Sequence, residues 1–246
     1  MVNYPELKNK YVLLTGANSG IGLAQAREFL GQGAKVIGLD CNVDQMQQLK
    51  AIYTTNFGYY QVDLTDEKQL DTVIGKISKV DILLNTAGVL DDYQPIETTS
   101  INLWQKILAT NVTTMFNVTK NILPLLAEGS VIVNMASIAG MVAGGGGIAY
   151  TTSKHAVIGF TKQLALDLAE RGIRVNGIAP GCIDTPMNAK DFANGGEMAK
   201  SVAKEVPIKR WAGAEEVARV ATFLASNGAS YLQGTIIPVD GGWITK

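Results

Sequence analysis

Short apolar segments of strand length alternate along the chain with segments of helical periodicity, and this alternation limits the fold more than any other feature. Runs such as YVLLT and VIVNM are continuously apolar, as is typical of parallel strands covered on both faces. Seven such runs occur, at residues 10–16, 34–40, 58–64, 80–88, 129–137, 173–181 and 234–240. The sequence therefore predicts an α/β fold with a doubly wound, parallel, seven-stranded sheet and helices on both faces.

Length and composition predict one domain. The chain has 246 residues, of which 47% are hydrophobic and 17% charged, so it can bury a large core. It contains no linker and no clear internal repeat, and we expect residues 1–246 to form a single domain. Residues 183–206 form the one sizeable insertion, after the carboxyl end of a predicted strand, where ligands bind in open sheets. We expect this segment to be a substrate lid.

Charge and residue usage exclude several classes of partner. The formal net charge is −1 and there is no basic tail, which argues against nucleic acid binding. No run of about 18 apolar residues is present, and the apolar run near the N-terminus is too short for a signal peptide, so we expect no membrane partner. Two cysteines, Cys41 and Cys182, fit a reducing cytoplasm. We expect a cytoplasmic protein that acts on a small molecule.

The chain has a single histidine, His155. Catalysis by a Ser-His-Asp or Cys-His group would depend on this one residue, and a site with several histidine ligands is excluded. His155 follows Lys154 directly on a predicted helix, so the two side chains point in different directions. We expect a surface or interface histidine and no metal site.

A glycine-rich turn joins the first predicted strand to the first predicted helix. Gly16, Gly20 and Gly22 follow the spacing G-x-x-x-G-x-G. Such a turn brings backbone N–H groups and a helix N-terminus close to a pyrophosphate. Many strand-to-helix turns use glycine, but this one opens the first βα unit, where a dinucleotide site is expected.

Asp40 ends the second predicted strand. A carboxylate there could accept hydrogen bonds from an adenosine ribose and would repel a 2′-phosphate, although it could also be a solvated turn residue. Ser19 stands in the glycine loop where a basic residue would suit a 2′-phosphate, and neither Lys35 nor Lys50 is well placed to replace it. Together with the glycine loop, Asp40 favours NAD over NADP as the cofactor.

A candidate catalytic group of four residues lies farther along the chain. Tyr150 and Lys154 are four positions apart, so on a helix they lie on one face. A lone Y-x-x-x-K pair often occurs by chance. Here Ser137 ends the strand-like run VIVNMAS, and Asn111 lies within the long helical region at residues 101–126.

These motifs, taken in order, resemble those of the short-chain dehydrogenase/reductase family over essentially the whole chain. The family's T-G-x-x-x-G-x-G stands at residues 15–22, its adenine-side acid is Asp63, and its N-N-A-G is NTAG at residues 85–88. The P-G motif is followed by the family's nicotinamide-binding Thr185, and the ending PVDGGW is also typical. Thr86 in NTAG is the one departure, and we expect it to alter only local strand packing.

The resemblance implies a Rossmann-type NAD(P)-binding domain and assigns roles to particular positions. The catalytic set would be Asn111, Ser137, Tyr150 and Lys154. The cofactor would be bound by Gly16, Asn18, Ser19, Gly20, Ile21, Gly22, Asp40, Asp63, Leu64, Asn85, Ala87, Gly88, Tyr150, Lys154, Pro180, Gly181, Ile183 and Thr185.

Hydride transfer at a carbinol carbon requires a general acid or base at the oxygen, and Tyr150 would fill that role. We expect Lys154 and the nicotinamide ring to lower the tyrosine pKa by about 2–3 units, or roughly 3–4 kcal/mol. Ser137 would hold the substrate oxygen, and Lys154 would also bind the nicotinamide ribose. Asn111 would hold a water that links Lys154 to solvent.

The substrate class stays open. The chain resembles 3-oxoacyl-(acyl-carrier-protein) reductases, but Asp40 fits poorly with their usual NADPH and favours an NAD-linked enzyme of secondary alcohols and ketones. Sugar, polyol, diketone and steroid dehydrogenases of the family are alternatives, and residues 183–206 contain no obvious anchor for an anion. A protein that binds NAD(H) without catalysis, as a sensor or scaffold, is the alternative of another class. The resemblance also implies a homotetramer, assembled through residues 101–126, residues 150–169 and the last strand.

Four consecutive glycines, residues 144–147, precede Tyr150. They could be a permissive turn into the helix. Alternatively, their missing side chains could leave one wall of the substrate pocket open, so that the lid determines most of the specificity.

Overall fold

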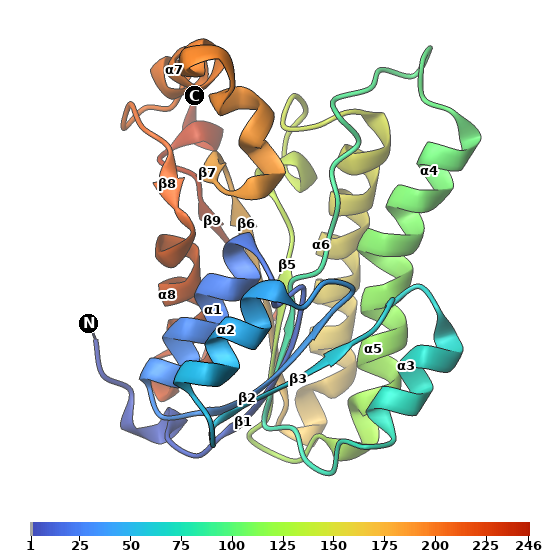
Figure 1. The fold of residues 1–246 in the computed structure, drawn as a ribbon, viewed down its shortest axis with the longest axis vertical. Helices are drawn as coiled ribbons and strands as arrows, with labels where there is room; N and C mark the ends of the chain where they lie inside the picture. The colour runs from blue at the N-terminus through green and yellow to red at the C-terminus, as the bar shows by residue number, and fades with distance from the viewer. Residues whose placement is uncertain (1) are drawn as a thin grey trace.

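Seven parallel strands form the central sheet of the computed structural model, which describes residues 2–246 (Figure 1). Their spatial order is β3-β2-β1-β4-β5-β6-β9. The bounds are β1 Tyr11–Thr15, β2 Lys35–Asp40, β3 Phe57–Gln61, β4 Ile82–Asn85, β5 Val131–Met135, β6 Arg174–Pro180 and β9 Ile236–Val239. Each strand lies within one of the predicted apolar runs or starts one residue before it. The predicted fold class, a single doubly wound α/β domain, is confirmed.

Two layers of helices cover the two faces of the sheet (Figure 1). On one face lie α1 (Gly20–Gly31), α2 (Asp44–Ile52) and α8 (Ala214–Ala225), and on the other lie α3 (Glu67–Ile74), α5 (Thr114–Ile122) and α6 (Ile148–Leu168). Neighbouring residues of a strand pack against opposite helix layers. Leu14 packs against the first set of helices and Leu13 against the second. Both are almost fully buried, which explains why the strands are continuously apolar.

The strand order reverses between β1 and β4, and this is where open α/β sheets bind ligands. Thr15, at the end of β1, ties the two strands together across this point. Its hydroxyl accepts hydrogen bonds from the backbone N–H groups of Thr86 (3.0 Å) and Ala87 (3.1 Å), which follow β4. The carboxyl ends of the two central strands therefore hold a fixed spacing beneath the crevice.

The long helical region expected at residues 101–126 is not one regular α-helix. It consists of α4 (Ile101–Leu108), a π-helical segment (Ala109–Thr113), α5 and a 3-10 turn (Leu123–Leu125) that contains Pro124. A π segment accommodates an extra residue within a helix and is frequent at functional sites. Asn111 lies within this segment.

The segment at residues 183–206 has regular structure of its own. β7 (Ile183–Asp184) pairs in parallel with β8 (Ala212–Gly213), and two 3-10 stretches lead to α7 (Glu197–Glu205). The rings of Phe192 and Trp211 lie 5.0 Å apart, and Trp211 Nε1 donates to the Ala199 carbonyl oxygen at 2.8 Å. In Figure 1, α7 stands at one end of the molecule, close to the C-terminus. Across residues 2–246, no helix has the length and apolar character needed to cross a membrane.

Candidate active site

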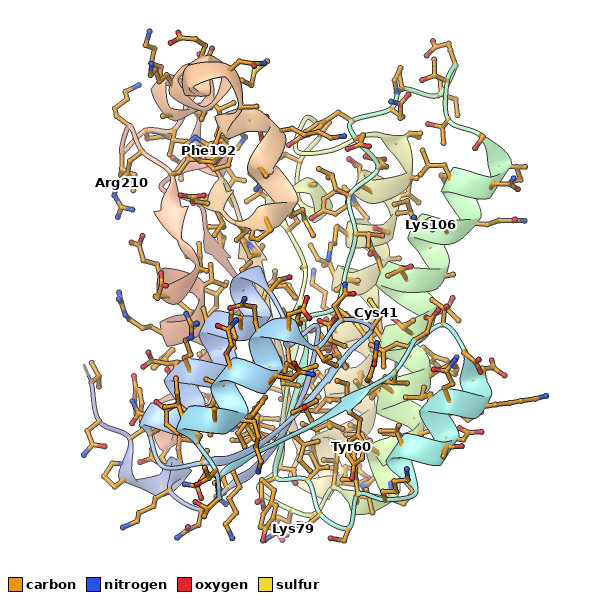
Figure 2. All side chains as sticks on the ribbon, viewed as in Figure 1. Cys41, Tyr60, Lys79, Lys106, Phe192 and Arg210 are labelled. Atoms are coloured by element: carbon orange, nitrogen blue, oxygen red, sulfur yellow. The ribbon has the colours of Figure 1, made fainter. Side chains whose placement is uncertain are left out.

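A cavity of about 1090 Å³ opens at the carboxyl ends of the strands, bounded on one side by the segment after β7. Most of the predicted site residues line it: Gly16, Ser19, Gly20, Ile21, Gly22, Asp40, Asp63, Leu64, Ala87, Gly88, Ser137, Tyr150, Lys154, Pro180, Gly181, Ile183 and Thr185. Figure 2 places Cys41, the neighbour of Asp40, near the middle of the molecule, with Phe192 and Lys106 above it on either side. Tyr60 and Lys79 lie below it, toward the opposite end.

Three predicted site residues do not line this cavity: Asn18, Asn85 and Asn111. Asn18 supports the site from behind, because its Oδ1 accepts hydrogen bonds from the backbone N–H groups of Gln45 and Met46 at the start of α2. Asn85 is buried at the end of β4, and its Nδ2 donates to Thr119 Oγ1 and Asn134 Oδ1. Both residues join elements beneath the cavity.

The glycine loop is packed too closely for side chains. Gly16 has φ +71°, and a Cβ there would lie 2.9 Å from the Ala87 Cα across the strand reversal. A Cβ on Gly22 would lie only 1.9 Å from the Gly16 carbonyl oxygen. No side chain caps α1 at Ser19, so the first N–H groups of the helix remain available at the cavity wall. Such an end favours a phosphate or pyrophosphate.

The carboxylate of Asp40 is held in place by backbone N–H groups. Asn18 N donates to Oδ2 and Asn42 N donates to Oδ1, both at 3.0 Å. The two lysines considered near it are engaged elsewhere: Lys35 Nζ contacts the Tyr11 hydroxyl at 3.3 Å, and Lys50 Nζ donates to carbonyl oxygens at residues 54 and 57. Among the residues that the structure describes, no Lys or Arg makes an ion pair with Asp40. The Asp40 carboxylate can therefore accept hydrogen bonds from the two hydroxyl groups of a diol bound beside it.

Asp63 and Leu64 follow β3 and complete the same side of the cavity. The Asp63 Oδ1 atom accepts hydrogen bonds from the backbone N–H (2.9 Å) and hydroxyl (2.6 Å) of Thr65. These bonds turn the chain at the end of the strand and keep Leu64 largely buried.

Tyr150 and Lys154 lie one turn apart on α6 and are 7% and 3% exposed. Lys154 Nζ lies 5.5 Å from the centroid of the Tyr150 ring and donates to the Met135 carbonyl oxygen at 2.9 Å. Ser137 follows β5 at the same wall, and its hydroxyl accepts from Ala139 N at 3.1 Å. The structure thus brings three of the four predicted catalytic residues together at the cavity.

Asn111, the fourth, approaches from the π segment. Its amide forms a strand-like pair with Val89, accepting from Val89 N at 2.8 Å and donating to Val89 O at 3.0 Å, and it also donates to Ser153 Oγ. A Cβ at Gly88 would lie 3.3 Å from Asn111 Oδ1 and 3.5 Å from Lys154 Nζ. Asn111 Oδ1 and Lys154 Nζ therefore face the same side of Gly88, and Asn111 also fixes the turn after β4.

Burial shifts the pKa values of both members of the pair. The expected lowering of the tyrosine pKa includes the charge of a bound nicotinamide ring and stays a prediction; in the protein alone, burial raises the pKa of Tyr150 to about 12, and the charges of Tyr93 and Asp91 act in the same direction. Only Ser137 lowers this pKa. Burial lowers the pKa of Lys154 to about 8. In this structure the Tyr150 hydroxyl is therefore protonated at neutral pH, because desolvation outweighs the hydrogen bond with Ser137.

Asp91 was missed from the sequence. It lies in the loop after β4, is 1% exposed, and accepts hydrogen bonds from Gly147 N (2.9 Å), Tyr150 N (2.8 Å) and Tyr93 N (3.2 Å). The only sequence signal was an acidic residue soon after NTAG, and nothing local connects it to a helix that starts more than 50 residues later.

The four glycines before Tyr150 divide into two pairs. Gly144 and Gly145 line the cavity. Gly146 and Gly147 are required by close packing, since a Cβ on Gly146 would lie 2.4 Å from Tyr150 Cδ1 and a Cβ on Gly147 would lie 2.5 Å from Gln94 N. A Cβ on Gly145 would lie 3.1 Å from Ala139 Cβ, whereas nothing lies within 4 Å of a Cβ on Gly144, so the expectation of an open pocket wall applies to Gly144 alone.

Two further expectations can be compared with the structure. Thr86 does more than alter strand packing, because its hydroxyl donates to Gln25 Oε1 of α1 at 2.6 Å and links β4 to the helix after the glycine loop. His155 is exposed, with Nδ1 2.9 Å from the Thr151 carbonyl oxygen. Within residues 2–246, no group of three His, Cys, Asp or Glu side chains is close enough to hold a metal ion.

Comparison with known proteins gives consistent relatives. A family model described as enoyl-(acyl carrier protein) reductase matches residues 16–244. The 3-oxoacyl-(acyl-carrier-protein) reductase of Thermotoga maritima is 37% identical, over 97% of this chain and 99% of that protein. The 3beta-hydroxysteroid dehydrogenase 2 of Eggerthella lenta is 33% identical, over 97% and 96%. The solved aldohexose dehydrogenase of Thermoplasma acidophilum superposes with a TM-score of 0.89 at 31% identity, covering 99% of this chain and 97% of its own.

The motifs, the sheet and the matches agree over nearly the full length of the chain. This protein belongs to the short-chain dehydrogenase/reductase family of oxidoreductases, whose members bind nicotinamide cofactors.

Proposed function

We propose that the protein is an NAD-dependent oxidoreductase that transfers a hydride between nicotinamide and a secondary alcohol or ketone. The observation that carries this proposal is a single cavity with a fixed, unpaired acid at one end and a buried tyrosine, lysine and serine at the other. NAD is favoured over NADP because a 2′-phosphate beside Asp40 would meet a carboxylate without a compensating cation.

The residues around Tyr150 support ketone reduction at neutral pH. Bound nicotinamide in its reduced form supplies the hydride that reaches the carbonyl carbon. The Tyr150 hydroxyl, with its pKa raised to about 12, is protonated and can donate to the developing alkoxide oxygen. Ser137 is placed beside it to hold that oxygen by a hydrogen bond. Lys154, with a pKa lowered to about 8, retains a proton at pH 7 and can return one to the tyrosinate.

The catalytic end of the cavity favours a largely apolar substrate. Its lining includes apolar side chains on both the catalytic and the lid side: Leu90, Ile138, Met187, Met198, Val202 and Trp211. A 3-oxoacyl-like ketone, a diketone or a steroid ketone would bury apolar surface here, whereas a sugar or polyol would depend on the few polar side chains of the lining, such as Asn188 and Asp191. The relatives act on acyl, steroid and aldohexose substrates, so their names do not select among these classes.

A panel of ketones and secondary alcohols, each assayed with NADH, NADPH and the oxidised cofactors, tests the proposal. We expect turnover of apolar ketones with NADH, and we expect Tyr150→Phe to abolish turnover while NADH binding is retained. Tyr60→Phe, on β3 away from the cavity, is the matched control and should behave as wild type. Wild-type kcat in Tyr150→Phe would refute the proposal. Tight NADH binding without turnover of any compound would favour the sensor or scaffold alternative.

Assembly and location are part of the same proposal. We expect a homotetramer, because α5 and α6 expose apolar side chains such as Phe116 (47%) and Leu166 (71%). We also expect the enzyme to work in the cytoplasm, where its two free cysteines would stay reduced. Light scattering on the purified protein measures the mass of the assembly. A mass near 26.2 kDa, that of one chain, would contradict the expected homotetramer.

A further inference from the structure

Asp91 is a buried carboxylate that accepts hydrogen bonds from backbone N–H groups. It is 1% exposed, and across residues 2–246 no basic side chain forms an ion pair with it. Its partners are the backbone N–H groups of Gly147, Tyr150 and Tyr93. A buried, unpaired charge is costly, and charge-assisted hydrogen bonds are what offsets that cost.

These bonds cap α6 from outside the helix. Gly147 is the N-cap residue and has no side chain that could accept a hydrogen bond, and Tyr150 is the third residue of the helix. In a capping box, the side chains of the N-cap and N3 residues accept hydrogen bonds from these two backbone N–H groups. Here the Asp91 carboxylate accepts both of them. Gln94 adds to this cap, because its carbonyl oxygen accepts from Ile148 N at 3.1 Å. The loop at residues 91–94 thus determines where the first turn of α6 lies.

The close approach of this loop depends on Gly147. A Cβ at this position would lie 2.5 Å from both the N and O atoms of Gln94 and 2.6 Å from Asp91 Oδ2. The absence of a side chain at Gly147 therefore allows the Asp91 carboxylate to reach the backbone of Tyr150.

We propose that Asp91 is a positioning residue for the reaction, whose carboxylate fixes the backbone of Tyr150 and whose negative charge acts on the proton of the Tyr150 hydroxyl. This inference rests on the proposed function of Tyr150 as the proton donor. Asp91 touches neither the reacting atoms nor, by its position outside the cavity lining, the cofactor.

Charged and polar groups from several elements act on the ionisation of Tyr150 or lie beside its ring. Tyr93 and Asp91 on the loop after β4 raise its pKa, Ser137 after β5 lowers it, and Lys154 lies below the ring on α6. Burial raises the pKa of Tyr93, and the charge of Asp191 on the lid adds to this rise. Removal of the Asp91 charge should therefore lower the pKa of Tyr150, while the other groups stay in place.

Asp91→Asn tests the inference, because it keeps the size of the side chain and removes the charge. Asn retains one acceptor oxygen, so we expect kcat for ketone reduction to fall about tenfold, with the Kd for NADH within about twofold of wild type. The rate of alcohol oxidation requires the tyrosinate and rises with pH. We expect that rise to move to lower pH, because the charge of Asp91 raises the pKa of Tyr150.

Asp92→Asn is the matched control. Asp92 is the next residue, is exposed and pairs with Lys190 at 2.8 Å, so its loss should leave kcat and the pH profile unchanged. Asp91→Glu keeps the charge but displaces the acceptors, so kcat should fall while the pH profile stays as in wild type. This second variant separates position from charge, and it keeps the inference testable if Asp91→Asn folds poorly.

A titration of phenolate absorbance gives a readout without turnover. The difference between wild type and Tyr150→Phe reports the ionisation of Tyr150, and the same difference in the Asp91→Asn background should show it at lower pH. An unchanged titration together with an unchanged oxidation profile would overturn the inference, and so would a loss of kcat fully accounted for by weaker NADH binding. Absence of turnover in wild type, with the titration shifted as expected, would instead refute only the proposed function.

Discussion

Replacement of Asp40 by serine should exchange the cofactor preference. In the proposed function, Asp40 accepts hydrogen bonds from the adenosine ribose and repels a 2′-phosphate. Its carboxylate is fixed by Asn18 N and Asn42 N, both at 3.0 Å, so it cannot turn away from a phosphate bound beside it. Asp40→Ser removes the charge and leaves a short hydroxyl at the same wall.

The magnitude follows from two effects. Hydrogen bonds to a charged acceptor contribute about 1.5–3 kcal/mol, so kcat/KM with NADH should fall about 10–100-fold. A phosphate of charge about −1.5 to −2, roughly 5 Å from a carboxylate at an effective dielectric constant of about 40, is repelled by about 2–3 kcal/mol. Release of that repulsion should raise kcat/KM with NADPH by about 30–100-fold. The ratio of the two values should change by about three orders of magnitude.

Initial rates with a fixed ketone and varied NADH or NADPH measure this ratio. Asp44→Ser, in the first turn of α2 and outside the cavity lining, is the matched control and should leave the ratio unchanged. Because Asp40 also supports its own loop, the thermal midpoint should be measured for each variant, and only the ratio of the two cofactors should be interpreted. A ratio within threefold of wild type, or a preference of the wild type for NADPH, would refute the reasoning.

Two further predictions concern the helix that carries the catalytic pair. Lys154→Met should abolish turnover and yet raise the free energy of unfolding at pH 7 by about 1–3 kcal/mol, because burial lowers the pKa of Lys154 to about 8. The cost of the buried charge is fully present below pH 8 and disappears as the pH rises through 8 to 10.5, so urea unfolding at pH 7 and pH 10 should show a gain only at pH 7. Gly147→Ala should destabilise the protein by more than about 2 kcal/mol, because its Cβ would lie 2.5 Å from Gln94 backbone atoms. Gly159→Ala, on the same helix with nothing within 4 Å of its Cβ, should stabilise it by about 0.5–1 kcal/mol, and equal effects of the two changes in thermal unfolding would contradict the packing argument.

The sheet could be predicted because its signal is local. Each strand is a continuous apolar run, and the flanking glycine and polar residues define its ends. The π segment could not be predicted, since the apolar positions of α4 and α5 continue across it and only tertiary contacts, such as those of Asn111 with Val89 and Ser153, select the extra residue.

The candidate site was predicted where chemistry depends on residue types at fixed spacing. The glycine loop, Asp40, Ser137, Tyr150 and Lys154 all line one cavity. The sequence could not indicate how deeply the tyrosine is buried, and this burial raises its pKa to about 12 in the protein alone. Asp91 escaped detection because its role depends on a contact between the loop after β4 and the start of α6.

That contact has a consequence for the order of folding. Asp91 and Gly147 are 56 residues apart, and the segment between them includes α4, α5 and β5. The body of α6 can form early from local hydrogen bonds, but its first turn gains its cap only when this long loop closes, and closure of distant contacts is slow. A chain that already has native helix content therefore lacks a correctly held Tyr150. During refolding, the return of enzyme activity should report the closure of this loop, later than the return of helical circular dichroism.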